Sequence, residues 1–435
     1  MMIEQEQLDL QQTKMLSKLS VLELPGLEKL QLDKLLFNVT SFSIQAKSYQ
    51  SVRYIVKKLI SNTFYFNSNI KKSKLLLITY DYKRKDHTDA WNVIKNLFGM
   101  YDEICVGEES FCKKQLCSFK RIFTSLKRWI IYVNRLKTVG LLKERGILAA
   151  SLVELQRARE KIVSLSIEKQ VVLIFFDGGS LENLMIQELK LRGCITITMQ
   201  HGQPVFHGLN TDRINQTMIL NFTSHYIIVT GDYSKKQFLL GGLKETQIKV
   251  LGSLKKMKSY KETKTRKFTI FLDCPTYINA YNDNCFMIEI AQRIAEKMNM
   301  QYMVKLHPQD TMSRYMHLTL KRGYIIEISS TMEEALNQAE FCILHASGVY
   351  LDILSYGKKS FCLKTAINFP LVERELDLFE DINELKSKIS IWNSTSNGEK
   401  EQYINELVDY YLKPQNALEK HKLFIEKLIN DMLYF

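Results

Sequence analysis

The sequence alternates between short, wholly apolar runs and longer amphipathic stretches, and this alternation limits the folds that the chain can adopt. In the first half, the apolar runs lie at 74–80, 103–106, 171–176, 194–199 and 225–230. Runs that are apolar on both faces predict parallel strands, and the amphipathic stretches between them predict helices that cover both sides of the sheet. The first half is therefore predicted to form an α/β domain.

The same rhythm restarts after residue 266. Strands are predicted at 268–272, 302–306 and 341–344, and amphipathic helices at 285–298, 332–337 and 349–355. The second half repeats the architecture of the first half without repeating its sequence.

A lysine-rich segment with few apolar residues separates the halves and predicts a linker. The predicted fold class is α/β and GT-B-like, with two Rossmann-like domains facing a cleft and a helical C-terminal tail. We place the first domain at 1–252, the linker at 253–267, the second domain at 268–380 and the tail at 381–435. The tail is expected to pack against the first domain, and a ligand is expected outside the carboxyl ends of the strands.

The composition indicates an anionic partner. Lysine and arginine number 60 against 47 acids, so the net charge is +13. No apolar run approaches the roughly 20 residues needed to cross a bilayer, and the N-terminal segment is acidic where a signal peptide is basic. The eight cysteines include no CxxC pair and predict reduced thiols. The expected location is cytoplasmic.

Three loops carry a histidine directly after a predicted strand. They contain His201 in QHGQP, His307 followed by Pro308, and His345 in HASG. Residues at the carboxyl ends of parallel strands face the ligand-binding edge of the sheet. One such histidine can equally cap a carbonyl group, but three at equivalent positions favour a functional site.

The loop after 341–344 has the features of an anion site. Ser347 and Gly348 open a predicted helix, whose first amides and dipole favour a phosphate. His307 is expected to donate a hydrogen bond to the same diphosphate, and Lys305 lies two residues earlier. His345 and Pro308 complete the predicted donor-binding set. The alternative for Ser347 is an ordinary helix N-cap.

Two residues of the first domain are candidates for the general base. Asp177 follows the strand at 171–176 and precedes two glycines, although Asp-Gly is also a common turn sequence. His201 ionises near neutral pH without special tuning. The sequence contains no Walker A loop, no GxGxxG after a strand, no Asp-x-Asp and no zinc-type spacing, so we expect no metal and no cofactor besides the activated donor.

A basic amphipathic helix is predicted near 113–137. Residues 113–145 contain ten lysines and arginines against one acid, Glu144. This pattern is typical of attachment to an anionic membrane surface, with Phe119, Phe123 and Trp129 entering the headgroups. The alternative is a surface helix with a solvated basic face. No nucleic-acid-binding module accompanies the charge, so no nucleic-acid partner is expected.

With these loops, the sequence resembles GT-B bacterial surface-polysaccharide glycosyltransferases. It is similar to the CDP-glycerol glycerophosphotransferases of teichoic acid synthesis and to the capsule sialyl- and polysialyltransferases, over roughly residues 170–365. The resemblance is carried by the QHG loop, the KLHP sequence at 305–308 and the serine-bearing loop before 349–354. It implies Asp177 as the base and His307 as the ligand of the donor phosphate.

The resemblance implies a metal-independent glycosyltransferase that uses a nucleotide-sugar donor. Such an enzyme moves a sugar, or an alditol phosphate, to a glycan or lipid-linked acceptor in bacterial capsule or surface polysaccharide synthesis, at the inner face of the plasma membrane. One alternative is a UDP-sugar 2-epimerase of the same fold. Another is a non-catalytic, membrane-associated partner that binds glycan. Release of nucleotide only with an acceptor separates the transferase from the epimerase.

Overall fold

The computed structural model describes residues 2–60, 64–80, 85–108, 119–200, 202–206, 208, 216–274, 280–326, 331–345, 347–364 and 372–433. The chain forms two compact units, which are described separately. Unit 1 comprises Met1–Val229, Lys235–Leu251 and Asn416–Phe435. Unit 2 comprises Thr230–Ser234 and Gly252–Gln415.

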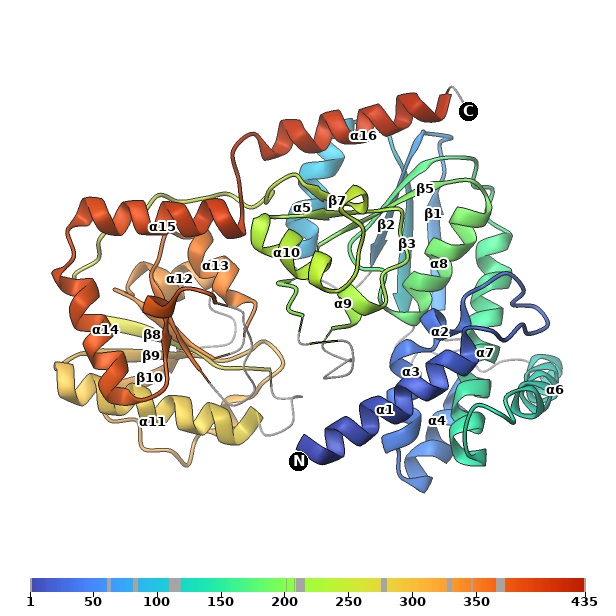
Figure 1. The fold of residues 1–435 in the computed structure, drawn as a ribbon, viewed down its shortest axis with the longest axis horizontal. Helices are drawn as coiled ribbons and strands as arrows, with labels where there is room; N and C mark the ends of the chain where they lie inside the picture. The colour runs from blue at the N-terminus through green and yellow to red at the C-terminus, as the bar shows by residue number, and fades with distance from the viewer. Residues whose placement is uncertain are drawn as a thin grey trace. The chain divides into compact units, whose positions relative to one another are not determined.

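Unit 1 is built on a mostly parallel sheet with the strand order β1-β3-β2-β4-β5-β6-β7 (Figure 1). The edge strand β1 runs antiparallel to β3, and the other neighbours run parallel. The central strands are buried on both faces, which explains their wholly apolar sequences. The strands are β1 Phe64–Asn69, β2 Leu75–Tyr80, β3 Asp102–Glu108, β4 Val171–Ile174, β5 Ile195–Met199, β6 Tyr226–Val229 and β7 Ile248–Val250.

Helices surround this sheet, and the long helix α7 (Leu142–Val163) is at the centre of their packing. Most of α7 is buried, because it contacts α3, α4, α6 and α8. Its apolar residues join those of β2, β4 and α8 in one core. The other helices up to β7 are α1 Met2–Leu19, α2 Leu32–Leu35, α3 Phe37–Gln45, α4 Ser48–Ile60, α5 Lys85–Phe98, α6 Phe119–Arg135, α8 Ser180–Leu191, α9 Thr217–Leu220, α10 Asp232–Leu240 and the 3-10 helix Glu245–Gln247.

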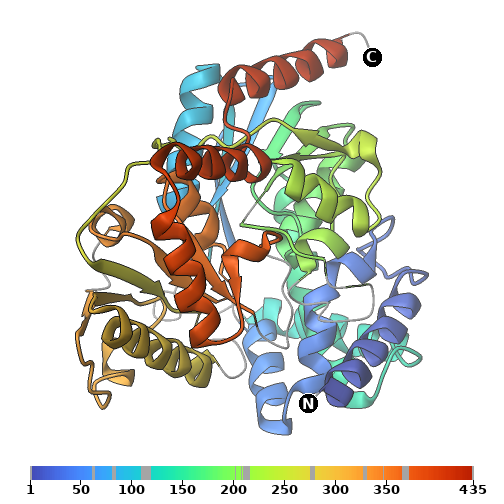
Figure 2. The same ribbon diagram turned by 60° about the vertical axis from the view of Figure 1, so that its left-hand side comes forward.

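The C-terminal helix α16 (Ala417–Leu433) belongs to unit 1, where it packs beside α5 (Figures 1 and 2). Phe424 of α16 meets the Tyr226 ring edge-to-face, with ring centroids 5.6 Å apart. The helical segment 381–435 is thus divided between the two units, because α14 and α15 pack in unit 2.

Unit 2 contains a parallel sheet with the strand order β10-β9-β8-β11-β12-β13. Its strands are β8 Lys267–Phe271, β9 Gln301–Lys305, β10 Gly323–Ile326, β11 Cys342–Leu344, β12 Ser360–Leu363 and β13 Leu378–Phe379. Its helices are α11 Ala280–Met298, α12 Met332–Asn337, α13 Val349–Ser355, α14 Ile382–Ser394, α15 Asn397–Tyr411 and two 3-10 helices, Met312–Arg314 and Glu375–Asp377. A separate core of aromatic and aliphatic side chains joins β8, β9 and β11 to α11 and α14.

The lysine-rich segment 253–267 is largely without regular structure and lies against unit 2. The Lys258 amide donates to the Ser355 carbonyl oxygen at 2.8 Å, and Tyr260 contacts Trp392 edge-to-face. Gly357 allows this close approach: it has φ +65°, and a Cβ atom there would lie 2.7 Å from the Ser259 carbonyl oxygen.

The predicted fold class is confirmed in its main feature, which is two α/β halves that each contain a parallel sheet. The expected cleft depends on how the two units are placed, and it stays a prediction. Within the described ranges, no helix has both the length and the apolar character of a membrane span.

Candidate functional site

Three polar residues gather at the carboxyl edge of the unit 2 sheet. Strands β9, β8 and β11 are neighbours and run parallel, so the residues that follow them share one edge. Asp273 follows β8, His307 follows β9 and His345 follows β11. Sequence reasoning overlooked Asp273, although Asp273 satisfies the same positional criterion as the two histidines.

Asp273 and His345 form a buried hydrogen-bonded pair. The Asp273 Oδ2 and His345 Nδ1 atoms are 2.6 Å apart, and the two residues are only 6% and 8% exposed. Because an ionised carboxylate can only accept, this contact places a proton on Nδ1 and fixes the orientation of the ring. The second oxygen, Oδ1, is buried and has no hydrogen-bond partner among the described residues. The hydrogen bond to Asp273 therefore holds the His345 ring in one orientation.

A chain of buried polar side chains supports this pair. Asn284 of α11 accepts a hydrogen bond from the Asp273 amide at 2.8 Å and donates to the Tyr315 hydroxyl at 3.0 Å. Tyr315 in turn donates to Asp310 Oδ2 at 2.6 Å, and the Asp310 amide donates to the His307 carbonyl oxygen at 2.9 Å. Burial raises the pKa of Tyr315, so it remains a hydroxyl donor. This network couples the loops after β8 and β9.

Lys305 is the last residue of β9, and the loop that follows carries His307 and Pro308. The Gln309 amide donates to His307 Nδ1 at 3.2 Å, so the neutral His307 ring carries its proton on Nε2. Lys305 is 9% exposed, and burial lowers the pKa of its ammonium group. Pro308 is exposed. His307 therefore presents an Nε2–H donor, which is the group that a phosphate oxygen requires.

Ser347 and Gly348 lie at the start of α13. The Ser347 hydroxyl accepts a 3.4 Å hydrogen bond from the Val349 amide, and Gly348 adopts a helical conformation with φ −58°. The N-cap of α13 is Gly348 and no described side chain caps this helix, so the alternative interpretation of Ser347 as an ordinary N-cap was wrong. Ser347 and Gly348 are small residues after the end of β11. Their role in phosphate binding stays a prediction.

Of the two base candidates in unit 1, only Asp177 is among the described residues, while His201 lies outside them. Asp177 is completely buried, and its Oδ2 atom accepts hydrogen bonds from the amides of Thr223 at 3.0 Å and Ser224 at 2.9 Å. Burial raises the pKa of Asp177, and the backbone hydrogen bonds oppose this shift. These two hydrogen bonds fix the position of Thr223 and Ser224, which directly precede His225 and β6.

Unit 1 has a cavity of about 270 Å³ at the carboxyl ends of β2 and β3. Tyr80, Val106 and Gly107 lie at these strand ends, and Ser180–Glu182 open α8 beside them. The ion pair between Lys58 of α4 and Glu154 of α7 also lines the cavity. Sequence reasoning missed this cavity, because α4 and α7 supply much of its wall.

The basic helix is α6, whose described part begins at Phe119. Four apolar side chains at helical spacing are exposed: Phe119 (92%), Phe123 (73%), Leu126 (41%) and Ile130 (54%). At 100° per residue they share one face, and Lys120 and Lys127 lie beside it. The expectation for Trp129 was wrong: its Nε1–H donates to the Gly146 carbonyl oxygen at 2.9 Å, because Trp129 lies on the face that packs against α7.

Over the described part of the chain, no three His, Cys, Asp or Glu side chains gather closely enough to hold a metal ion. The expectation that the reaction needs no metal stays a prediction.

No family model matches the chain, and no curated protein does. Three solved structures illustrate what the chain is similar to. The Methanocaldococcus jannaschii UDP-GlcNAc 2-epimerase, in complex with UDP-GlcNAc and UDP, has 16% identity and a TM-score of 0.45, over 78% of this chain and 100% of that chain. The Neisseria meningitidis UDP-GlcNAc 2-epimerase, bound to UDP-GlcNAc, has 10% identity and a TM-score of 0.49, over 82% and 100%.

The third structure is S. aureus TarM in complex with Fondaparinux, alpha-GlcNAc-glycerol and UDP. It has 12% identity and a TM-score of 0.45, over 61% of this chain and 58% of that chain. At such identities and TM-scores the similarity carries no argument about activity, so the function has to be argued from the residues of this chain.

Proposed function

We propose that this chain is a glycosyltransferase that moves a sugar, or an alditol phosphate, from a nucleotide-activated donor to a glycan or lipid-linked acceptor of a bacterial capsule or surface polysaccharide. The carboxyl edge of the unit 2 sheet binds the donor. The observation that carries this proposal is the buried Asp273–His345 pair, which shares that edge with His307.

The pair suits the binding of a departing diphosphate. The hydrogen bond to Asp273 orients the His345 ring, and a protonated His345 ring would be a charge-assisted donor to a phosphate oxygen. The Nε2–H group of His307 supplies a second donor, and Ser347 and Gly348 supply a hydroxyl and a helix start. Donors that are already oriented stabilise the charge that develops as the donor bond breaks.

The transfer step follows from these roles. The acceptor hydroxyl gives its proton to a base, its oxygen bonds to the transferred carbon or phosphorus, and the bond to the nucleotide phosphate breaks. We assign the base to His201 rather than Asp177, because the Asp177 carboxylate is wholly buried and holds two backbone amides. The site contains cationic and neutral donors in the place of a metal, and metal independence is part of the proposal.

The unit 1 cavity is the proposed acceptor site. Its lining combines the aromatic rings of Tyr54 and Tyr80 with the Glu182 carboxylate and the Ser151 hydroxyl. Rings and carboxylates are groups that contact the apolar faces and hydroxyls of sugars.

The experiment measures nucleotide release from UDP-, CDP-, CMP- and GDP-activated donors, with and without acceptor glycan and with EDTA. We expect one donor class to release nucleotide only when the acceptor is present, and EDTA to leave the rate unchanged. Conversion of a UDP-sugar into its C2 epimer, with the nucleotide still attached and no acceptor present, favours a UDP-sugar 2-epimerase. Absence of release and of nucleotide binding contradicts the proposed activity and favours a non-catalytic glycan-binding partner.

We further propose that α6 attaches the protein to an anionic membrane surface at the cytoplasmic face. The stripe of Phe119, Phe123, Leu126 and Ile130 is exposed, and 73% of the Phe123 surface is accessible. Exposed apolar rings beside lysines match the headgroup region of an acidic bilayer.

Vesicle co-sedimentation tests this attachment. We expect binding to vesicles containing phosphatidylglycerol, weaker binding at high salt, and little binding to purely zwitterionic vesicles. Phe119→Ser/Phe123→Ser should abolish binding, whereas Val21→Ser, which alters an exposed apolar residue outside α6, should not. Equal binding by the double variant and the unmodified protein contradicts the assignment.

A further inference from the structure

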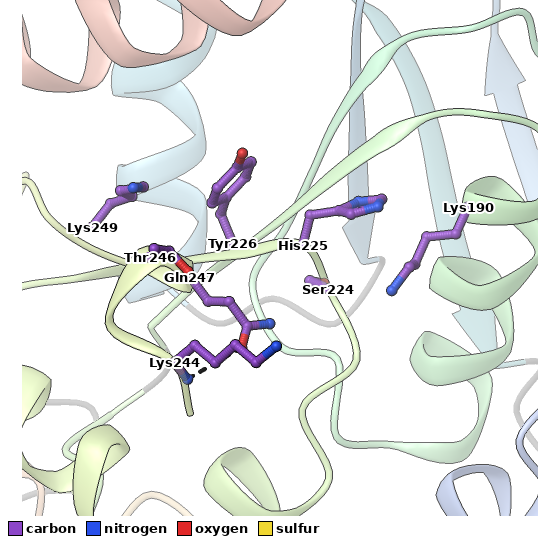
Figure 3. A pocket seen from close by; sticks show the side chains of 8 residues that line it. All are labelled: Lys190, Ser224, His225, Tyr226, Lys244, Thr246, Gln247 and Lys249. Atoms are coloured by element: carbon purple, nitrogen blue, oxygen red, sulfur yellow. Dashed lines mark hydrogen bonds between the residues drawn. The ribbon is translucent and has the colours of Figure 1, made fainter. Parts of the chain in front are cut away.

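A larger cavity lies at the opposite, amino edge of the unit 1 sheet, where β6 and β7 begin. It measures about 600 Å³. Its lining combines cationic and hydrogen-bonding side chains: Lys190, Ser224, His225, Tyr226, Lys244, Thr246, Gln247 and Lys249. In Figure 3, Lys190 and Lys244 extend from opposite sides toward Ser224, and the His225 ring projects toward Lys190.

Several side chains that line this cavity are hydrogen-bond donors. Lys190 Nζ donates to the Thr223 carbonyl oxygen at 2.7 Å, which uses one of its three protons. The Thr196 amide donates to His225 Nδ1 at 3.0 Å, so the neutral His225 ring carries its proton on Nε2. Burial, reinforced by the Lys190 charge, lowers the pKa of His225, and the ring therefore remains a neutral donor at pH 7.

No compensating negative charge lines this cavity among the described residues. Glu245 follows Lys244 in the sequence, but its carboxylate is bound by Lys235 at 2.6 Å. Asp177 is wholly buried, holds the amides of Thr223 and Ser224, and does not line the cavity. Its charge acts on Lys190, where it opposes the effect of burial on the lysine pKa.

Lys249 Nζ lies over the Tyr226 ring, 5.3 Å from its centroid, so Lys190 and Lys244 are the two lysines that extend into the hollow. An anion bound between these two lysines would offset their mutual repulsion.

We propose that this cavity is a binding site for a phosphate or diphosphate group. Lysines act as point charges for phosphate oxygens, and Thr246 and His225 add directional donors, whereas the buried Ser224 hydroxyl is paired with Thr198 Oγ1 at 2.8 Å. A volume of about 600 Å³ accommodates a phosphorylated small molecule or a lipid headgroup. The site belongs to unit 1 and does not depend on the donor site proposed for unit 2.

Calorimetric titration with inorganic pyrophosphate tests the site in the full chain. We expect Lys190→Met/Lys244→Met to weaken one binding event at least tenfold, while Lys14→Met/Lys18→Met, which removes two exposed charges from α1, leaves it unchanged. Because Lys190 is half-buried, the exposed Lys244→Glu provides a second variant that keeps the fold. Equal pyrophosphate binding by all variants overturns the proposal, and so does an absence of binding to the unmodified protein.

The His345→Ala chain separates this site from the donor site. Binding that survives His345→Ala and is lost in the lysine variants supports the unit 1 site, whatever the outcome for unit 2. Binding that is lost in His345→Ala and unchanged in the lysine variants overturns the unit 1 site and leaves the proposed function standing. Competition by UDP or by dihexanoyl phosphatidic acid then identifies a soluble or a lipid source of the phosphate.

Discussion

Each unit has an aspartate just beyond the end of a central parallel strand, yet the two carboxylates have different partners. Asp177 of unit 1 is wholly buried and accepts hydrogen bonds from two backbone amides. Asp273 of unit 2 is 6% exposed and accepts one from an imidazole. A carboxylate that binds amides fixes a loop, whereas one that binds an imidazole fixes the tautomer and orientation of a ring that can act on a ligand. Equivalent places in the topology therefore do not imply equivalent roles.

The largest expected effect is the loss of donor turnover when His345 of unit 2, the partner of Asp273, is replaced. His345→Ala should lower the kcat/KM of donor turnover by roughly 10²–10³, because it removes an oriented donor to the departing phosphate. His317→Ala is the matched control, since His317 is exposed in the same unit and pairs with Tyr281. Equal kinetics for the two variants contradict the assignment of His345.

On the unit 1 side the expected loss is in stability. Asp177→Ala should lower the free energy of unfolding by about 2–4 kcal/mol, because it leaves the amides of Thr223 and Ser224 buried without an acceptor. Urea titration followed by circular dichroism measures this change. Turnover per folded molecule should stay close to that of the unmodified protein. A loss of turnover at unchanged stability would restore Asp177 as the candidate base.

Two substitutions of Asp273 test separately the contributions of its charge and of its hydrogen bond to His345. Asp273→Asn keeps an oxygen acceptor for the His345 Nδ1–H group but loses the charge, so turnover should fall about tenfold, in the range seen for outer-shell partners. Asp273→Ala loses both and should reduce turnover further. Steady-state kinetics on both variants provide the readout, and identical kinetics for Asn and Ala argue against a positioning role.

The smallest effect concerns pH. Burial lowers the pKa of His421 in α16 below its ordinary value of 6.5. The unfolded chain then binds more protons between the folded pKa and 6.5, so this contribution to stability is complete above about pH 6.5 and is lost as the pH falls through that window. We expect the stability to fall as the pH is lowered from 6.5 to 5, and a flatter profile in His421→Gln. A profile unaffected by His421→Gln contradicts this attribution.

The sequence predicted the fold well where burial leaves a simple pattern. β2, β4, β5, β6, β8, β9 and β11 are continuous apolar runs, because helices cover both faces of their sheets. The edge strand β1 (FYFNSN) is polar and half-exposed, so it has no such pattern and was missed. The two-residue strand β13 is too short to leave any pattern.

The candidate site was only partly predictable for a different reason. His307 and His345 stand out because each follows an apolar strand next to proline or a small residue. The pairing of Asp273 with His345 depends on β8 lying beside β11, and strand order is not written in local sequence. Asn284 and Tyr315 contribute through contacts made only after folding. Trp129 was misassigned because the helical pattern marks an apolar residue without showing which face of α6 meets α7.

The central claim is that the carboxyl edge of unit 2 binds the phosphate of a nucleotide-activated donor through His345 and His307. Calorimetric titration of the unmodified, His345→Ala and Asp177→Asn chains with UDP, CMP, CDP and GDP, in EDTA, tests it most directly. The account predicts that one nucleotide binds the unmodified and Asp177→Asn chains alike, and that His345→Ala weakens this binding at least tenfold. Binding of no nucleotide, or equal binding by all three chains, contradicts the account.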